Sequence, residues 1–432
     1  MVIRADWHLR KPCGMVVLAG LLLFAFPVTA GAQPYSIDAF PIPSQGTSFG
    51  IAADADGSIW YTSSFPNVVG HVSPTGHITE FPIPTTADSL SGIVIGPDDN
   101  IWFGEWSNPP GTPPLNRIGR ISKNGSNFRE FDASGGGNPR YLILGPDRNI
   151  WFTNGSGLGR ITAAGDVTLF GPPASAVCFG DTYGLTIGPD GALWVAVILG
   201  TGPARFDLGT EEFSVMSLWG CGTTVTNITT GPDGNLWLAD FYRGSLARVT
   251  LSGVLTTFDL PGSSMGIVTV GSDLFVVRAG PVSQISRIDP STGLVLDSYP
   301  TVTPFSLPEN LAVDPSGNIW FNEQDGRNIG RLSRQPLRCI DALALKNSNG
   351  ALTMRFGLKS ETPAVWGTWL LVNGTVVPLW LGPSPAVSPE RIFDVPLPAF
   401  TPSGVVVVVT VLINANLEVC GDVRAIDTGP RR

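Results

Sequence analysis

A seven-residue motif that ends in tryptophan recurs along this chain at steps of 38 to 49 residues, and its clearest copy reads Gly-Pro-Asp-Gly-Asn-Leu-Trp. The last position of the motif is occupied in turn by Trp60, Trp102, Trp151, Trp194, Trp237, Phe275 and Trp320. A repeat of this period, built from short β-rich segments, is typical of a propeller blade. The repeat therefore predicts an all-β fold with a seven-bladed β-propeller over residues 33–336.

Turn chemistry explains the recurring letters of the motif. In the fourth copy, the apolar segments 185–187 and 192–195 flank the turn Pro189-Asp190-Gly191. Proline presets φ for the first turn position, aspartate tolerates the second, and glycine accepts the left-handed conformation that closes the hairpin. We therefore interpret these aspartates as turn formers rather than as metal ligands.

The two ends of the repeat region predict how the ring closes. No fourth strand follows Arg331-Leu332, whereas the segment 37–43 near the N-terminus closely matches the fourth-strand segment 78–84. The N-terminal strand is therefore expected to complete blade seven, which leaves no exposed sheet edge at the junction.

The first 32 residues have the order of a secretory signal peptide. Basic residues precede an apolar run from Met15 to Phe26, and Ala30-Gly31-Ala32 provides small residues for cleavage. The run is too short to cross a bilayer, which needs about 20 residues. The sequence thus predicts a protein without a membrane span that is secreted, periplasmic or held at the cell surface.

Four cysteines follow the signal, and an even number in an oxidising compartment favours two disulfides among three possible pairings. Cys178 and Cys221 fall in corresponding loops of consecutive blades, so their pairing is preferred. Cys339 and Cys420 then form the second disulfide. Free buried thiols are the alternative.

From residue 337 to 432 the repeat gives way to a different β pattern. Asn373-Gly374 marks a tight hairpin, and a second hairpin runs from Val405 into the segment ending at Cys420. This region predicts a small β-sandwich of immunoglobulin-like outline. Its tryptophans, Trp366, Trp369 and Trp380, fit core packing better than a sugar-binding patch.

The net charge of −9 argues against nucleic acid as a partner, because an acidic surface repels phosphate backbones. We expect a monomer that binds a small molecule, a peptide or a glycan. The loops 104–116, 171–183 and 216–226 are the variable ones, and they should lie on one face of the propeller. Trp106 and Trp219 lie in these loops. Variable loops on a rigid scaffold commonly carry binding sites.

Counting from each tryptophan predicts two rings of residues at the centre of this face. The exit ring, three places beyond each tryptophan, consists of Ser63, Glu105, Asn154, Val197, Asp240, Arg278 and Glu323. The entry ring, just before the first strand of each blade, consists of Phe49, Ser91, Arg140, Tyr183, Thr226, Met265 or Gly266, and Glu309. The binding candidates among them are Glu105, Arg140, Tyr183, Asp240, Arg278 and Glu323.

Glu309 and Glu323 belong to one blade and are the candidate catalytic residues. A carboxylate pair near a channel mouth can serve as acid and base, or it can bind a divalent cation such as magnesium or calcium, with Glu323 as the candidate ligand. The alternative is a solvated carboxylate pair whose charge Arg278 or Arg327 compensates.

The motif, together with Ile118-Gly119-Arg120-Ile121 and the segment 79–84, resembles the streptogramin B lyase family over about residues 35 to 334. The resemblance implies a seven-bladed propeller that opens a cyclic depsipeptide at its ester by magnesium-assisted elimination. It also implies histidines before the first strand of late blades, where this chain has Met265 or Gly266 and Glu309. No histidine follows His77, while Glu323 matches a glutamate of the family motif.

Three functions remain as hypotheses. The first is a secreted propeller that binds a ligand or partner through its variable-loop face. The second is a metal-assisted lyase acting on a cyclic depsipeptide, or a lactonase-type hydrolase, using Glu309 and Glu323 with Asp240 as a further candidate. The third is a structural surface protein.

Overall fold

The structure is a computed structural model. It describes residues 35–334 except 86, 108–113, 173–175, 177, 261 and 281, and the backbone of seven strands between 342 and 427. The predicted signal peptide, Cys339 and the side chains of Cys420 and the three C-terminal tryptophans lie outside this part. The chain divides into a compact unit spanning Tyr35–Ser333 and a second unit that holds the C-terminal strands. Within the part described, no helix is long and apolar enough to span a membrane.

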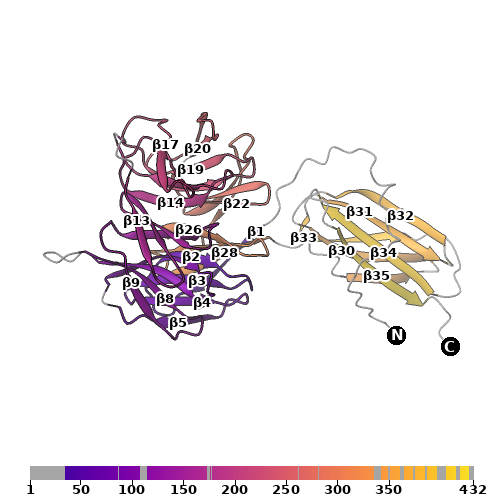
Figure 1. The fold of residues 1–432 in the computed structure, drawn as a ribbon. Helices are drawn as coiled ribbons and strands as arrows, with labels where there is room; N and C mark the ends of the chain where they lie inside the picture. The colour runs from indigo at the N-terminus through magenta and orange to yellow at the C-terminus, as the bar shows by residue number, and fades with distance from the viewer. Residues whose placement is uncertain are drawn as a thin grey trace. The chain divides into compact units, whose positions relative to one another are not determined.

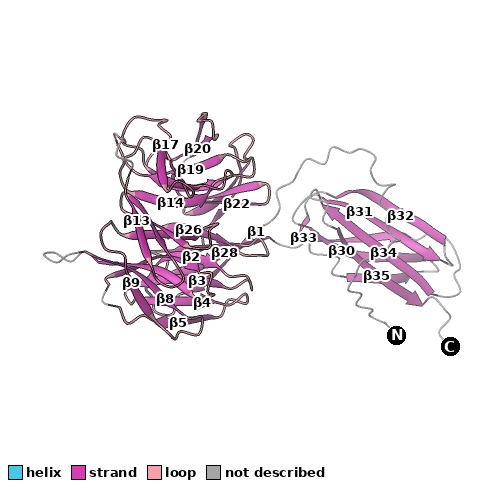
Figure 2. Cartoon of the chain, in the orientation of Figure 1, coloured by secondary structure: helices cyan, strands magenta, loops and turns pink. Residues whose placement is uncertain are grey.

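The first unit is a ring of seven four-stranded antiparallel sheets, which confirms the predicted seven-bladed propeller (Figures 1 and 2). The innermost strands of the blades are β2 (Thr47–Ala53), β6 (Ser89–Ile95), β10 (Pro139–Leu144), β14 (Thr182–Ile187), β18 (Val225–Thr230), β22 (Ser263–Val270) and β26 (Pro308–Val313). The second strands are β3 (Ile59–Ser64), β7 (Ile101–Ser107), β11 (Ile150–Asn154), β15 (Leu193–Val197), β19 (Leu236–Asp240), β23 (Asp273–Ala279) and β27 (Ile319–Glu323). Each innermost strand contacts that of the next blade, and β26 contacts β2, so the ring is closed.

The two outer strands complete each blade. The third strands are β4 (Val68–Val72), β8 (Leu115–Ile121), β12 (Gly157–Ile161), β16 (Ala204–Asp207), β20 (Ser245–Val249), β24 (Gln284–Ile288) and β28 (Asn328–Arg334). The fourth strands are β5 (Ile78–Pro82), β9 (Arg129–Asp132), β13 (Val167–Phe170), β17 (Glu212–Val215), β21 (Leu255–Asp259), β25 (Val295–Pro300) and β1 (Tyr35–Pro41). As predicted, the N-terminal strand β1 pairs with β28 and supplies the fourth strand of blade seven.

The motif tryptophans are clamped by the aspartate of their own turn. The Trp237 indole Nε1–H donates to Asp233 Oδ1 at 3.0 Å, and the same bond joins Trp102 to Asp98 at 2.9 Å. Gly234 closes the turn with φ 71°, as the turn chemistry predicts. The aspartate therefore has a second role that turn propensity alone does not reveal, because it satisfies a polar group on a fully buried side chain.

A fourth-strand phenylalanine and the recurring third-strand arginine complete this cluster. In blade five, the Phe258 ring stacks on Trp237 with centroids 5.3 Å apart, and the Arg248 guanidinium lies 5.9 Å from the Trp237 ring. Blade seven repeats the arrangement across the chain closure, where Phe40 of β1 stacks on Trp320. The recurring arginine, represented by Arg248 in blade five, thus braces its own blade.

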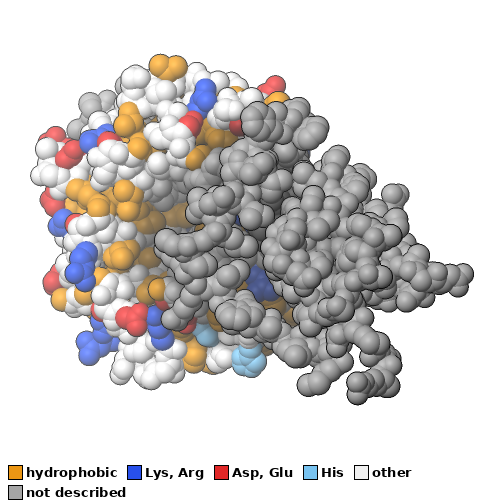
Figure 3. Space-filling model, turned by 90° about the vertical axis from the view of Figure 1, so that its right-hand side faces the viewer, with side chains coloured by type: hydrophobic (Ala, Val, Ile, Leu, Met, Phe, Trp, Pro, Cys, Tyr) orange, Lys and Arg blue, Asp and Glu red, His pale blue; other side chains and the backbone are white. Residues whose placement is uncertain are grey.

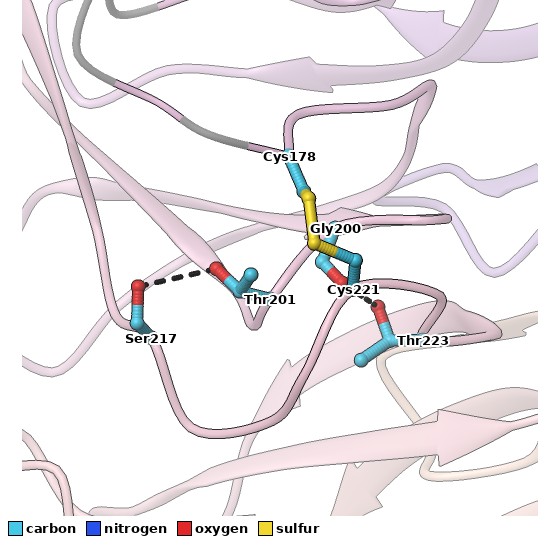
Figure 4. Close-up of a disulfide and its surroundings, with 6 residues drawn as sticks. All are labelled: Cys178, Gly200, Thr201, Ser217, Cys221 and Thr223. Atoms are coloured by element: carbon cyan, nitrogen blue, oxygen red, sulfur yellow. Dashed lines mark hydrogen bonds between the residues drawn. A yellow bond between two sulfur atoms is a disulfide. The ribbon is translucent and has the colours of Figure 1, made fainter.

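A disulfide joins Cys178 to Cys221 across neighbouring loops, and their Cα atoms are 5.8 Å apart (Figure 4). The first cysteine lies before β14 and the second before β18, so the bond ties the entrances of blades four and five. The loop of Cys221 is held further by Thr223, whose hydroxyl donates to the Gly200 carbonyl at 3.1 Å. This confirms the preferred pairing of these two cysteines.

The C-terminal unit consists of two antiparallel sheets. One contains β29 (Ala342–Ser348), β30 (Ala351–Ser360) and β33 (Val387–Pro396), and the other contains β32 (Thr375–Ser384), β31 (Ala364–Val372), β34 (Val405–Asn414) and β35 (Val419–Asp427). Both predicted hairpins are present, since Val372 pairs with Thr375 and Ile413 pairs with Val419. The immunoglobulin-like outline and the domain boundaries stay predictions.

Replacing Asp233 by alanine is expected to lower the free energy of unfolding of the propeller by about 1–3 kcal/mol, because the buried Trp237 N–H loses its acceptor. Urea unfolding followed by tryptophan fluorescence measures the change. Asp259→Ala is the matched control, since Asp259 is exposed on the outer strand of the same blade. Equal stability of the two variants would show that the clamp contributes nothing.

Candidate ligand-binding channel

Every innermost strand of the propeller carries a β-bulge at the same place. The pairing register between the first and second strands shifts between Ser48 and Ile51, Leu90 and Ile93, Pro139 and Leu142, Thr182 and Leu185, Val225 and Asn227, Ser264 and Ile267, and Pro308 and Leu311. The residues inside these shifts are those of the predicted entry ring. A bulge changes the direction of its side chains relative to a regular strand, and bulges are frequent beside functional sites. The side chains of the entry ring therefore leave the regular alternation of their strands.

Close approach between blades explains the glycines in four of the bulges. A Cβ on Gly266 would lie 2.5 Å from the Glu309 carbonyl oxygen, and one on Gly50 would lie 2.6 Å from that of Ser91. The other three blades carry Tyr141, Asn227 and Asn310 at the corresponding position. These blades therefore place an additional side chain at the bulge.

Side chains of the second strands hold the bulges in place. Thr62 Oγ1 accepts a hydrogen bond from the Gly50 N–H at 2.8 Å and donates to the Ser91 carbonyl of the next blade at 2.5 Å. Asn322 does the same at the ring closure, accepting from the Asn310 N–H at 2.7 Å and donating to the Ser48 carbonyl at 2.8 Å. The entry ring is thus built on a backbone that is hydrogen-bonded within and between blades.

The entry ring opens onto a central cavity of about 430 Å³. Five entry-ring residues line it, namely Phe49, Ser91, Arg140, Tyr183 and Glu309. Asn227 lines the cavity in blade five in place of the predicted Thr226, which instead lies within 3.5 Å of the Ser264 carbonyl. Trp106 of β7 also contributes to the lining.

Arg140 is fixed by Tyr183 of the next blade. Its Nη1 donates to the Tyr183 hydroxyl oxygen at 2.6 Å, and its guanidinium carbon lies 4.4 Å from the centroid of the Tyr183 ring. Burial raises the pKa of Tyr183, although the positive charge of Arg140 opposes this shift. The phenol therefore stays protonated at neutral pH and orients the guanidinium.

Glu309 is the acidic group of the cavity. Its Oε2 accepts a hydrogen bond from the Gln324 side-chain amide. Burial in the channel raises the pKa of Glu309 to about 7, and the charge of Arg140 acts in the opposite direction. Glu309 therefore changes its protonation near neutral pH, which a surface carboxyl does not do.

The exit ring does not line the cavity, contrary to the expectation of two rings at the channel. Ser63, Glu105, Asn154, Val197, Asp240 and Glu323 are buried, and Arg278 is half-buried. The reason is that the second strand of a blade lies behind the innermost strand. Its last side chain packs against its own blade instead of entering the channel.

Glu323 and Glu309 accordingly have separate neighbours. Glu323 Oε2 accepts from the Asn328 amide at 3.1 Å, and burial raises its pKa while bonds from Asn328, Thr303 and Ser306 lower it. Neither glutamate contributes to the pKa shift of the other, and no hydrogen bond joins them among the described residues.

The remaining binding candidates also engage their own blades. The Asp240 carboxylate accepts a hydrogen bond from the Thr224 hydroxyl and lies 3.9 Å from the Arg243 guanidinium. Arg278 Nη1 lies 3.3 Å from the Ser286 hydroxyl, and burial lowers the pKa of Arg278. Neither residue lines the cavity.

Glu105 faces a second carboxyl group inside blade two. Its Oε2 accepts from the Thr85 hydroxyl at 2.6 Å, and its Oε1 lies over Gly119, whose strand partner is Glu130. Burial raises the pKa of Glu105 to about 8, while the bond from Thr85 opposes the shift and the nearby Glu130 carboxyl adds to it. Glu130 in turn pairs with Arg117 at 2.9 Å. Glu105 is therefore a protonated carboxyl of the blade interior.

A comparison with family models identifies the family of this chain. A sequence model of the virginiamycin B lyase family matches residues 31–126 and 111–350. The chain belongs to the virginiamycin B lyase family. A virginiamycin B lyase of Bordetella parapertussis is 34% identical over 58 residues, which is 13% of this chain and 19% of that relative.

Two solved structures of virginiamycin B lyase from Staphylococcus aureus share the fold. One superimposes with a TM-score of 0.61, and the other, a catalytically inactive variant with quinupristin, with a TM-score of 0.62. In both cases the identity is 24%, and the match covers 69% of this chain and 99% of the other. At this identity the likeness shows the fold alone.

The side chains of the channel depart from the chemistry that family membership suggests. His71 and His77 are the only histidines of the described residues, and His71 packs on Trp60 with ring centroids 4.7 Å apart. No three His, Cys, Asp or Glu side chains within the described ranges come together as a metal site. A divalent cation prefers several carboxylate oxygens, so the residues of this channel do not fit the family's magnesium ion.

Sequence counting missed four polar residues of the cavity region, Tyr141, Asn227, Asn310 and Gln324. The interruption of the glycine pattern at the bulge is the signal that could have revealed the first three. Gln324 lies in a loop after β27, and only the structure shows that it reaches Glu309.

The stability of the propeller is expected to fall as pH rises from about 4.5 to about 8. The folded state keeps the proton of Glu105 after the unfolded chain has lost it, so the associated stability is complete below the ordinary pKa of 4.5 and disappears through the folded pKa near 8. Glu105→Gln should flatten this dependence, because the amide remains neutral and can donate to Glu130. Thermal unfolding from pH 4 to pH 9 measures it.

Exposed Glu212 supplies the control, since Glu212→Gln should leave the pH dependence unchanged. Glu309 contributes in the same direction up to about pH 7, so part of the slope remains in the Glu105 variant. A profile identical to that of the parent protein would contradict the protonated state of Glu105.

Proposed function

We propose that this chain is a secreted or periplasmic propeller that binds a small molecule or a short peptide in its central channel. The observation that carries the proposal is the convergence of Arg140, Tyr183 and Glu309 on one cavity of about 430 Å³. Ligand sites are commonly concave, largely apolar and about 300–1,000 Å³ in volume, with a few polar groups that fix orientation. The channel has this composition.

The bulges give the site the rigidity that binding requires. Arg140 is held by a hydrogen bond and a ring contact, and Glu309 is held by Gln324. Side chains that are already ordered lose little conformational entropy when a ligand binds. The preordered polar groups therefore favour recognition of a defined ligand.

Charge distribution favours a ligand other than nucleic acid. Basic and acidic side chains are interspersed on the face of the propeller that Figure 3 shows. The chain as a whole carries a net charge of −9. Nucleic-acid binding depends on a concentrated basic surface, which this arrangement does not supply on that face.

A screen of amino acids, dipeptides and sugars by thermal shift and calorimetry should yield a ligand whose affinity drops at least about tenfold in Arg140→Met, the effect of losing one good charged hydrogen bond. Arg160→Met is the control, because Arg160 braces the same blade over Trp151, outside the cavity lining. Binding that survives Arg140→Met and Tyr183→Phe unchanged would place the ligand elsewhere.

An enzymatic function is the second candidate, and the pKa of Glu309 near 7 favours it. A general base works best when its pKa lies close to the working pH. In an elimination that opens a cyclic depsipeptide, Glu309 would take the proton next to the carbon that carries the ester oxygen. The carbon–oxygen bond would then break, and Arg140 would pair with the carboxylate that leaves. In a lactonase-type hydrolysis, Glu309 would deprotonate the attacking water.

Incubation with quinupristin followed by chromatography and mass spectrometry distinguishes these reactions. Elimination gives a product of unchanged mass with altered retention, whereas hydrolysis adds the mass of one water. Glu309→Gln should abolish either product, since an amide cannot accept the proton, and Glu212→Gln should retain it. Turnover that persists in Glu309→Gln would remove Glu309 from the mechanism.

A further inference from the structure

Arg140 and Glu309 stand on opposite sides of the channel. Arg140 belongs to blade three and Glu309 to blade seven, so three blades separate them in one direction around the ring and two in the other. No two blades of a seven-membered ring are farther apart. Both residues nevertheless line the same cavity, and the charge of Arg140 lowers the pKa of Glu309.

The two opposite charges do not neutralise each other directly. Among the described residues, no ion pair within 4.0 Å joins Arg140 to Glu309. Each residue uses a single side-chain hydrogen bond to a neutral partner, Tyr183 for Nη1 of the arginine and Gln324 for Oε2 of the glutamate. Nε and Nη2 of Arg140 and Oε1 of Glu309 are thus uncommitted in the hydrogen-bond network of the described chain.

The lining of the cavity that holds the two charges is mainly apolar. Phe49, Trp106, Val94, Ile143 and Val268 belong to it, together with the polar side chains of Tyr141, Asn227 and Asn310. An uncompensated charge in such a setting is costly, because the apolar wall replaces part of its hydration. A ligand that brings a counter-charge to each side relieves both costs at once.

We propose that the channel binds a zwitterion, with the ligand carboxylate on Arg140 and the ligand ammonium on Glu309. The fitting class is an apolar α-amino acid or a short peptide with free ends, whose side chain packs on the apolar wall. This inference rests on the proposed binding function and specifies its ligand.

Charge complementarity also explains what the site rejects. A simple carboxylate leaves Glu309 without a partner, and a simple amine leaves Arg140 without one. Specificity arises because a ligand that lacks one charge forces the protein to bury an unpaired group. The planar guanidinium suits a carboxylate in particular, because its N–H donors match the spacing of the two oxygens.

Calorimetry with L-phenylalanine and the dipeptide Phe-Phe tests the assignment at pH 8, where Glu309 is ionised in the free protein. The zwitterions should bind at least about tenfold more tightly than 3-phenylpropionate, which lacks the ammonium, and than 2-phenylethylamine, which lacks the carboxylate and stays protonated at pH 8. Arg140→Met should erase the preference over 2-phenylethylamine alone, and Glu309→Gln the preference over 3-phenylpropionate alone. Arg160→Met should retain both preferences, and circular dichroism verifies that every variant is folded.

The outcomes separate this inference from the function on which it rests. Two results would overturn the zwitterion assignment and keep the binding channel. The first is equal binding of the three phenylalanine analogues. The second is binding of a neutral ligand that depends on Arg140 while both zwitterions fail to bind. Failure of all four probes and of the wider screen overturns both. A preference for zwitterions that survives both substitutions would place their site outside the channel.

Discussion

The bulge in each innermost strand is the constraint on which the rest of this propeller depends. Seven strands must meet around one axis, and each must approach the next closely enough for its backbone to pack on it. The bulges allow this approach, and side chains such as Thr62 and Asn322 supply hydrogen bonds that a regular ladder would otherwise make. Because a bulge also redirects its side chain, the same feature that closes the ring creates the ring of channel residues.

The outer part of each blade has the opposite character. There the tryptophan, its turn aspartate, a phenylalanine and an arginine form a unit whose polar atoms are satisfied within the propeller, as Trp237, Asp233, Phe258 and Arg248 illustrate. This unit fixes the spacing of the strands and leaves the inner positions free to vary. The outer part of each blade therefore contributes to stability, and the inner strands carry the residues that line the channel.

Much of the fold could be predicted because its determinants are local and repeated. The turn chemistry around Gly234 and the spacing of the tryptophans depend on neighbours in the chain, and the match between the segments 37–43 and 78–84 predicted the closure by β1. Counting from the tryptophans also assigned Arg140, Tyr183 and Glu309 to one ring, because the repeat places equivalent residues of each blade at the same position along the propeller axis.

The features of the candidate site that the sequence did not predict depend on contacts between distant parts of the chain. Counting from the tryptophans gives the position of Glu323 and Glu105 along the propeller axis but not their distance from it. Both residues belong to second strands, which lie one layer behind the strands that line the channel. Their side chains are consequently buried inside blades, where Glu105 reaches Glu130 over Gly119. The hydrogen bond from Gln324 to Glu309 joins a loop tip to a bulge, and no pattern in the sequence specifies that contact.

The blade unit and the channel residues of this propeller therefore have different determinants. Within this chain the repeat preserves the blade unit, whereas the bulge residues differ from blade to blade, because side chains of the second strands make the hydrogen bonds that hold the bulge backbone. In this chain a glutamate with a pKa near 7 occupies an entry position of blade seven, opposite an arginine held by a tyrosine. This separated pair of opposite charges in a mainly apolar channel is the reason why the proposed ligand carries charges of its own.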